Sequence, residues 1–128
     1  MPVISVLTAS DPSRGDLVLR ACTSVEDQVL PSGWQLEWIL QEDGAAPTLL
    51  QNLPEDDRIK YSHNDQKAGI AVTRNLGLVR ASGSFGRVLD DDEFLVPFLK
   101  FLLGSTNAKC SSIFLFGVLD PANKFIWS

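Results

Sequence analysis

The chain has 128 residues, of which 45% are hydrophobic, and a formal net charge of −5 from 11 basic and 16 acidic residues. This length and apolar fraction are typical of one globular domain with a buried core, and they exclude a long disordered chain. The acidic balance without a Lys/Arg cluster argues against nucleic-acid backbone binding, and no apolar run reaches the roughly 20 residues of a bilayer span.

Strand-like and helix-like segments alternate along the chain, which is typical of a mostly parallel sheet with helices packed on it. The continuous apolar run 3–9 predicts a strand that is buried on both faces. Ser10, Asp11 and Ser13 are candidate N-caps for a helix that continues through Val29. The next predicted elements are strand 36–40, a short helix over 48–53, strand 58–62 and a helix over 70–82, which Gly83 ends in a left-handed conformation.

The remaining predicted elements are strand 84–89, helix 94–103, strand 111–119 and a strand that begins at Lys124. We therefore expect an α/β fold over 1–128: a single domain with a three-layer, Rossmann-like, mostly parallel sheet and helices on both faces. Because the chain stops inside the last β-prone segment, we expect it to be an N-terminal portion, truncated after the sixth strand begins. The unpaired edge of such a sheet favours pairing with a second copy of the chain.

Polar clusters follow three of the predicted strands. Thr8 and Ser10 leave the first strand, Asp43 leaves the second, and Asp90–Asp92 leave the fourth. In an open α/β sheet, ligands bind at the carboxyl ends of the strands, near the point where the strand order reverses. The three clusters therefore predict one ligand site at this edge of the sheet.

The acidic triplet Asp90, Asp91 and Asp92 is the most unusual feature of the sequence. Adjacent carboxylates raise one another's pKa and destabilise the fold unless a cation neutralises them. Mg²⁺ and Mn²⁺ take such oxygen ligands, commonly together with substrate phosphates. The alternative is a solvated acidic turn at the N-terminus of the next helix. Its place after a buried strand favours the metal interpretation.

Several segments together resemble glycosyltransferase family 2, whose members use nucleotide sugars and have the GT-A fold. The resemblance spans Val3–Pro97 and includes "VISVLTAS", "LEWILQEDG" and, most specifically, "GIAVTRNLGLVRASGSFGRVLDDDE". It implies a nucleotide-sugar-binding domain, with the acceptor-binding part absent from this chain.

The resemblance implies roles for five residues of the nucleotide-sugar site. Thr8 matches a strand-one position that touches the nucleoside, and Ser10 stands where an aromatic residue often stacks on the base. Asp43 matches the acid that accepts a hydrogen bond from a pyrimidine ring. Arg74 and Asn75 match the "RN" pair in the helix beneath the sugar nucleotide.

The acidic triplet matches the DxD motif of this family through Asp90 and Asp92. Asp92 would bind Mn²⁺ or Mg²⁺ bridging the diphosphate, with Asp90 as its metal-site partner, and Asp91 would contact the ribose or the sugar. The implied reaction is metal-dependent, inverting transfer of a sugar, UDP-linked by expectation, to an acceptor hydroxyl. The family's catalytic base would lie beyond Ser128, so we expect the chain alone to be inactive.

Two other classes of function stay open. One is a non-catalytic nucleotide-binding or assembly module with the same fold, and the other is a nucleotidyltransferase, although "TASDPSRGD" offers only Arg14 as a basic residue. Lys67 and Arg74 could each face a diphosphate or be ordinary surface cations. Cys22 and Cys110 lack metal-ligand spacing and the sequence shows no signal peptide, so we expect a cytoplasmic protein with reduced thiols.

Overall fold

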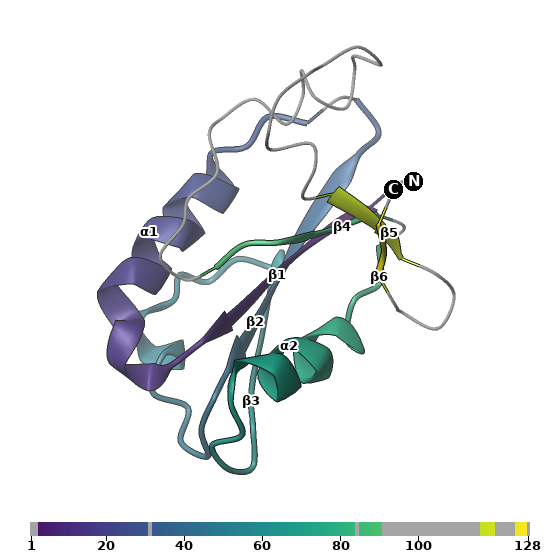
Figure 1. Cartoon of the computed structure of the whole chain (residues 1–128). Coiled ribbons are helices and arrows are strands. Elements are labelled where there is room, and N and C mark those ends of the chain that lie inside the picture. The colour runs from purple at the N-terminus through teal and green to yellow at the C-terminus, as the bar shows by residue number, and fades with distance from the viewer. Residues whose placement is uncertain (1–2, 31, 84, 91–115, 120–124, 128) are drawn as a thin grey trace.

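The computed structural model describes residues 3–30, 32–83, 85–90, 116–119 and 125–127 (Figure 1). The strands in these ranges are β1 (Val3–Ser10), β2 (Gln35–Glu42), β3 (Ile59–His63), β4 (Phe85–Val88), β5 (Phe116–Leu119) and β6 (Phe125–Trp127). They form one sheet in the order β3-β2-β1-β4-β5-β6. Strands β1 to β4 pair in parallel, whereas β5 is antiparallel to both β4 and β6. The predicted mostly parallel α/β sheet is confirmed for its first four strands.

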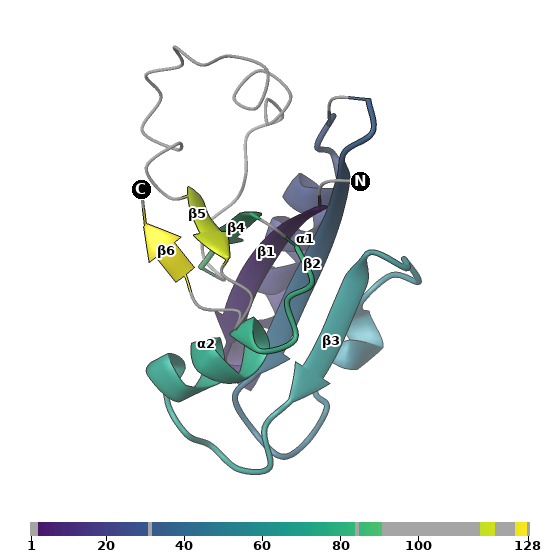
Figure 2. The ribbon, with the colours of Figure 1, turned by 90° about the vertical axis from the view of Figure 1, so that its right-hand side faces the viewer.

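Two α-helices cover the two faces of the parallel part of the sheet. Helix α1 (Gly15–Glu26) lies on one face and helix α2 (Ile70–Leu78) on the other (Figures 1 and 2). Short 3-10 turns, η1 (Pro12–Arg14) and η2 (Leu50–Asn52), follow β1 and β2 in the chain. The chain moves outward from β1 to β3 and then returns through α2 to β4 on the other side of β1. The strand order therefore reverses at β1.

The two faces of the sheet differ in polarity because side chains alternate along each strand. On the α1 side, buried apolar residues form the larger core: Ile4, Val6, Leu36, Trp38 and Leu40 from the sheet, and Val18, Ala21, Cys22 and Val25 from α1. On the α2 side, Leu7, Ile39 and Ala81 form a smaller cluster. Polar residues Ser5, Glu37 and Gln41 are also buried. The buried run in β1 confirms the predicted two-sided strand.

Several predicted boundaries are wrong. Helix α1 ends at Glu26 instead of Val29, and Val29 is 56% exposed. Helix α2 ends at Leu78 instead of residue 82. Arg80 turns back to donate to the backbone carbonyls of Leu40 and Lys60. The short helix predicted over 48–53 is only the turn η2, and the predicted helix 94–103 lies outside the described residues.

Gly83 does not have the left-handed conformation that the sequence predicts, since the described glycines with positive φ are Gly33 and Gly69. It is required instead by a close approach to β1. A Cβ atom at this position would lie 2.5 Å from the Val3 carbonyl oxygen and 2.6 Å from Ser5 Oγ. Its N–H also donates to Ser5 Oγ at 2.9 Å. Backbone contact, rather than backbone conformation, therefore explains this glycine.

We expect Gly83→Ala to lower the free energy of unfolding by about 1–2 kcal/mol, because the added methyl group overpacks a backbone contact. Urea unfolding followed by circular dichroism measures the change. Gly15→Ala is the matched control, since its Cβ would meet nothing closer than 3.8 Å and its φ is −55°. Equal stability of the Gly83→Ala variant and the parent would show that the loop after α2 moves freely from β1.

Candidate functional site

A pocket of about 590 Å³ opens at the carboxyl ends of β1, β2 and β4, where the strand order reverses. Its lining residues come from β1 and the turn after it, from the end of β2, from the loop and helix after β3, and from the end of β4: Ala9, Ser10, Asp11, Ser13, Arg14, Asp43, Lys67, Gly69, Ile70, Thr73 and Asp90. The structure thus brings Ser10, Asp43 and Asp90 together, as the positions of the three polar clusters predict.

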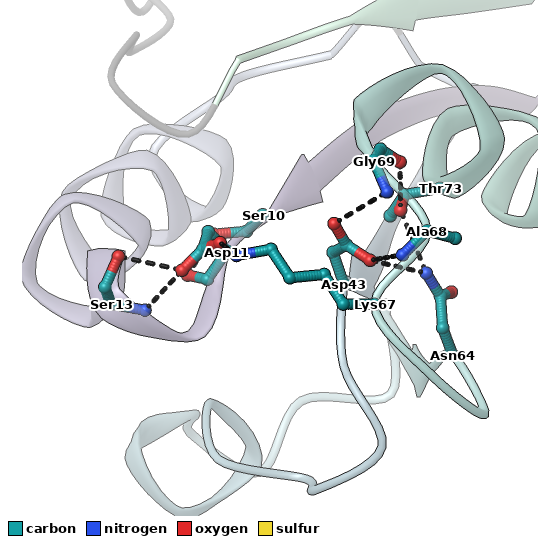
Figure 3. Close-up of polar contacts among 9 residues, drawn as sticks. All are labelled: Ser10, Asp11, Ser13, Asp43, Asn64, Lys67, Ala68, Gly69 and Thr73. Atoms are coloured by element: carbon teal, nitrogen blue, oxygen red, sulfur yellow. Dashed lines mark hydrogen bonds and ion pairs between the residues drawn. The ribbon is translucent and has the colours of Figure 1, made fainter.

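Asp43 stands one residue after β2 and is 7% exposed. Its Oδ1 accepts hydrogen bonds from the Ala68 N–H at 2.7 Å and from Asn64 Nδ2 at 3.1 Å, and its Oδ2 accepts one from the Gly69 N–H at 3.1 Å (Figure 3). Burial raises the pKa of Asp43, but these hydrogen bonds outweigh it and hold the pKa below its usual value. Asp43 is therefore an ionised anchor for the loop that precedes α2.

We call residues 64–69 the 64–69 loop. Asn64 is buried and bridges three residues: its Nδ2 donates to Asp43 Oδ1 and, at 2.9 Å, to Thr73 Oγ1, and its Oδ1 accepts from Gln41 Nε2 at 2.8 Å. Gly69 has φ +90°, a conformation that residues with a Cβ rarely adopt. In that conformation its N–H reaches Asp43 and its carbonyl accepts from Thr73 Oγ1 at 2.7 Å. The loop wall of the pocket is consequently well ordered.

The opposite wall is the turn after β1, where Asp11 is the N-cap of η1. Asp11 Oδ1 accepts from the N–H and the hydroxyl of Ser13, at 2.9 and 2.8 Å. Its Oδ2 accepts from Lys67 Nζ at 3.0 Å, and this ion pair joins the turn to the 64–69 loop (Figure 3). The Ser13 N–H and the Lys67 ammonium hold the pKa of Asp11 well below its usual range, and Asp11 in turn raises the pKa of Lys67.

Arg74 of α2 pairs with Asp90, the first residue of the acidic triplet. Arg74 Nη2 lies 2.5 Å from Asp90 Oδ1, and the two side chains are 37% and 42% exposed. Arg74 and Asp90, which lie 16 positions apart in the sequence, therefore meet beside the pocket that Asp90 lines. This contact orients the Asp90 carboxylate from the α2 side of the sheet.

The other predicted site residues lie elsewhere. Thr8 is fully buried, and its hydroxyl accepts a hydrogen bond from Trp38 Nε1 at 2.9 Å, on the α1 side of the sheet. Its side chain is thus unavailable to a ligand in this structure. Asn75 is exposed on α2 and does not line the pocket. Asp91 and Asp92 lie outside the described residues.

Three residues of the site, Asp11, Asn64 and Thr73, could not be assigned a site role from the sequence pattern. Asp11 is a predicted N-cap of the helix after β1, but it caps the turn η1, whereas the N-cap residue of α1 is Arg14, which makes no side-chain cap. Nothing in the sequence places Lys67 beside Asp11. A polar residue that follows a strand is the available signal for Asn64, which comes directly after β3. Thr73 comes directly before the "RN" pair, and its hydroxyl accepts from Asn64 and donates to the Gly69 carbonyl of the 64–69 loop.

The described residues contain neither a cluster of metal ligands nor a helix that could span a membrane. In these ranges, no group of three or more His, Cys, Asp or Glu side chains lies close enough to hold a metal ion. Asp90 is the one described residue of the predicted metal pair, since Asp92 falls outside. No described helix has the length and apolar character needed to cross a membrane.

Two curated bacterial proteins are similar to the chain in sequence, whereas no protein-family model matches it. A GalNAc(5)-diNAcBac-PP-undecaprenol beta-1,3-glucosyltransferase of Campylobacter jejuni is 35% identical over 120 residues, which cover 89% of this chain and 38% of the relative. TuaG of Bacillus subtilis, a glycosyltransferase assigned to teichuronic acid biosynthesis, is 34% identical over 94 residues, or 72% of this chain and 36% of the relative. The chain thus spans less than two fifths of either relative.

Solved structures share the fold, and one of them is that of a mannosyltransferase. S. aureus TarS 1–349 in complex with UDP-GlcNAc matches with a TM-score of 0.61 and 19% identity, over 73% of this chain and 27% of that one. The mannosyltransferase PcManGT of Pyrobaculum calidifontis, in complex with GDP-Man and Mn²⁺, matches with a TM-score of 0.61 and 16% identity, over 71% and 28% of the two chains. At these identities the matches show a common fold and nothing further.

Proposed function

Because the chain belongs to the family 2-like glycosyltransferases of the GT-A fold, of which it covers an N-terminal portion, we propose that its pocket binds a nucleotide-diphosphate sugar. The observation that carries this proposal is the pocket itself. Ser10, Asp43 and Asp90 come from three separate strand ends and line one cavity at the reversal of strand order. A cavity of about 590 Å³ is large enough for a ligand of nucleotide size.

We assign recognition of the base to the inner end of the pocket, at Asp43. A carboxylate offers about four acceptor positions, and three donors already occupy Asp43. The remaining position suits the single ring N–H of uracil, which supports a UDP-linked donor. Because the three donors keep Asp43 ionised and fixed in place, a base N–H would meet an oriented, charged acceptor.

We assign the diphosphate to the end of the pocket near Asp90. The Asp90 carboxylate lines the cavity and is oriented by Arg74, and carboxylate oxygen is the ligand type that Mg²⁺ and Mn²⁺ take. Asp90 and Asp92 would hold such an ion, with Asp91 facing the ribose or the sugar. When bound, the ion would neutralise the charge that develops on the departing diphosphate.

The reaction that follows from this arrangement is the transfer of the donor's sugar to an acceptor hydroxyl. We propose direct attack by that hydroxyl, with inversion at the sugar carbon and help from a carboxylate base. None of the described residues is assigned as this base, because Asp11, Asp43 and Asp90 each already hold a cation or backbone donors. In the part of the chain that the structure describes, the residues thus bind and orient the donor.

We expect UDP to bind at least about tenfold more tightly with Mn²⁺ than with EDTA, since the ion would be shared between protein carboxylates and the diphosphate. Titration calorimetry measures both affinities. In Asp92→Ala the enhancement should disappear, whereas Asp57→Ala, at an exposed acid away from the pocket, should keep it. Equal UDP affinity in Mn²⁺ and in EDTA would remove the metal assignment, and no UDP binding under either condition would remove the donor site.

A further inference from the structure

The ion pair between Asp11 and Lys67 spans the pocket, and its two residues come from opposite walls. Asp11 belongs to the turn after β1 and Lys67 to the 64–69 loop, 56 positions later. Both line the same cavity, and Figure 3 shows the Lys67 side chain extended from its loop across to Asp11, with Asp43 nearby. The ammonium group therefore lies where a ligand entering the cavity would pass.

The two residues of this ion pair differ in their other contacts. Asp11 keeps two hydrogen bonds from Ser13 whether or not Lys67 is present. The Lys67 side chain is 72% exposed, and Asp11 is its ion-pair partner among the described residues. Ion pairs that are this exposed to water contribute little to stability, because the charges are well solvated when they are apart. Lys67 can consequently leave Asp11 without disturbing either wall.

Two other charged side chains that line the pocket, Asp43 and Asp90, have partners of their own. Arg74 is paired with Asp90, and Asp43 is bound by three donors of the 64–69 loop. The backbone that follows Lys67 is also held in place, because the next two residues, Ala68 and Gly69, donate to Asp43. The root of the Lys67 side chain is therefore positioned while its charged end can change partner.

Resting on the donor site proposed above, we propose that Lys67 is a phosphate-binding residue that exchanges partners: it pairs with Asp11 in the empty pocket and with a phosphate oxygen of the bound nucleotide diphosphate. A diphosphate carries more negative charge than the Asp11 carboxylate, and an ammonium group binds phosphate well as a compact point charge. Asp11 then competes with the ligand for Lys67. This competition selects for ligands that bring phosphate, because a nucleoside has no charge with which to displace the carboxylate.

If Lys67 exchanges partners in this way, substitutions of Lys67 and of Asp11 should change the affinity for phosphate ligands in opposite directions. Lys67→Met should weaken binding of UDP and of inorganic pyrophosphate by about tenfold, the size expected for a lost charge-assisted hydrogen bond, and leave uridine binding unchanged. Lys67→Arg should keep most of the affinity. Asp11→Asn keeps an acceptor for the Ser13 N–H but removes the competing charge, so it should tighten binding of UDP and pyrophosphate about two- to fivefold, by the energy of an exposed ion pair. All these changes should shrink at high salt.

Titration calorimetry of the purified protein with UDP, pyrophosphate and uridine, each with Mn²⁺, tests the proposal. Lys60→Met is the matched control, because Lys60 is an exposed lysine of β3 that does not line this pocket. If the parent binds UDP and Lys67→Met binds it equally well, the partner exchange is wrong while the donor site stands. If the parent binds pyrophosphate but not UDP, the nucleotide assignment is wrong, and the Lys67→Met titration with pyrophosphate still decides the exchange. If the parent binds neither, both proposals fail.

Discussion

Replacing Trp38 with alanine should lower the free energy of unfolding by about 3–5 kcal/mol, the range measured when large aromatic side chains are truncated in protein cores. Among the described residues, Trp38 is the largest fully buried side chain, and it stands in the middle of β2, between the neighbouring strands β1 and β3. It packs with the apolar residues that face α1. The surrounding strands are tied together by their backbone hydrogen bonds, so the cavity left by alanine cannot collapse fully.

Urea unfolding followed by circular dichroism measures this loss. Trp34→Ala is the matched control, because Trp34 is only partly buried, although its ring centroid lies 5.4 Å from that of Phe85. We expect that variant to lose clearly less stability than Trp38→Ala. Comparable losses in the two variants would contradict the position of Trp38 at the centre of the core.

The hydrogen bond from Trp38 Nε1 to Thr8 Oγ1 should also contribute to stability. Thr8→Val keeps the shape of the side chain but leaves the buried indole N–H without an acceptor, at an expected loss of about 1–3 kcal/mol. UDP binding should be unchanged, because Thr8 is fully buried. A loss of UDP affinity without a loss of stability would instead support the nucleoside contact that the family resemblance implies for Thr8.

Replacing Asp43 with alanine should lower the free energy of unfolding by about 3 kcal/mol, because three donors of the 64–69 loop would lose a charged acceptor. The donors at Ala68 and Gly69 lie in exposed residues that water can reach, so the loss stays below the sum of three buried bonds. UDP binding should be lost in the same variant, because the loop wall of the pocket and the acceptor for the base disappear together.

Asp43→Asn separates these two contributions. It keeps the Oδ1 acceptor but turns an NH₂ group toward the Gly69 N–H, and it offers no second acceptor to the base. We expect a smaller loss of stability than in Asp43→Ala, with UDP affinity still at least about tenfold lower. Asp16→Asn, at an exposed acid of α1, is the control. UDP binding equal to that of the parent would show that Asp43 only positions the loop.

The stabilising effect of Asp43 should also depend on pH. Its pKa is lower in the folded protein than in the unfolded chain, so the folded state favours the ionised form, and this stabilisation is present above the unfolded pKa near 4. It is lost as the pH falls through the lower, folded value. The stability difference between the parent and Asp43→Asn should therefore be largest near neutral pH and shrink in acid. Urea unfolding from about pH 7 to about pH 3 tests this, and a difference that grows in acid would contradict it.

Much of the fold could be predicted from local sequence patterns. The apolar run 3–9, the breaks at Gly and Pro, and the alternation of periodicities placed β1, α1, β2, β3, α2 and β4 in the correct order, since these patterns reflect burial of each segment against its neighbours. The predicted helix ends were less accurate. Val29 is apolar and lies four positions after Val25, but α1 already ends at Glu26. Helix ends depend on the path of the following chain, which local spacing does not describe.

The same contrast holds for the site. Polar residues follow the strands in the sequence, and because parallel strands end at one edge of a sheet, this pattern was enough to predict that Ser10, Asp43 and Asp90 meet there. The partner that each side chain binds depends on packing in three dimensions. Thr8 faces the core instead of the pocket because alternation along β1 directs it to the α1 side, against Trp38. The pairing of Asp11 with Lys67 arises because two loops that are distant in sequence become opposite walls of one cavity, and a contact of that kind leaves no periodic trace in the chain.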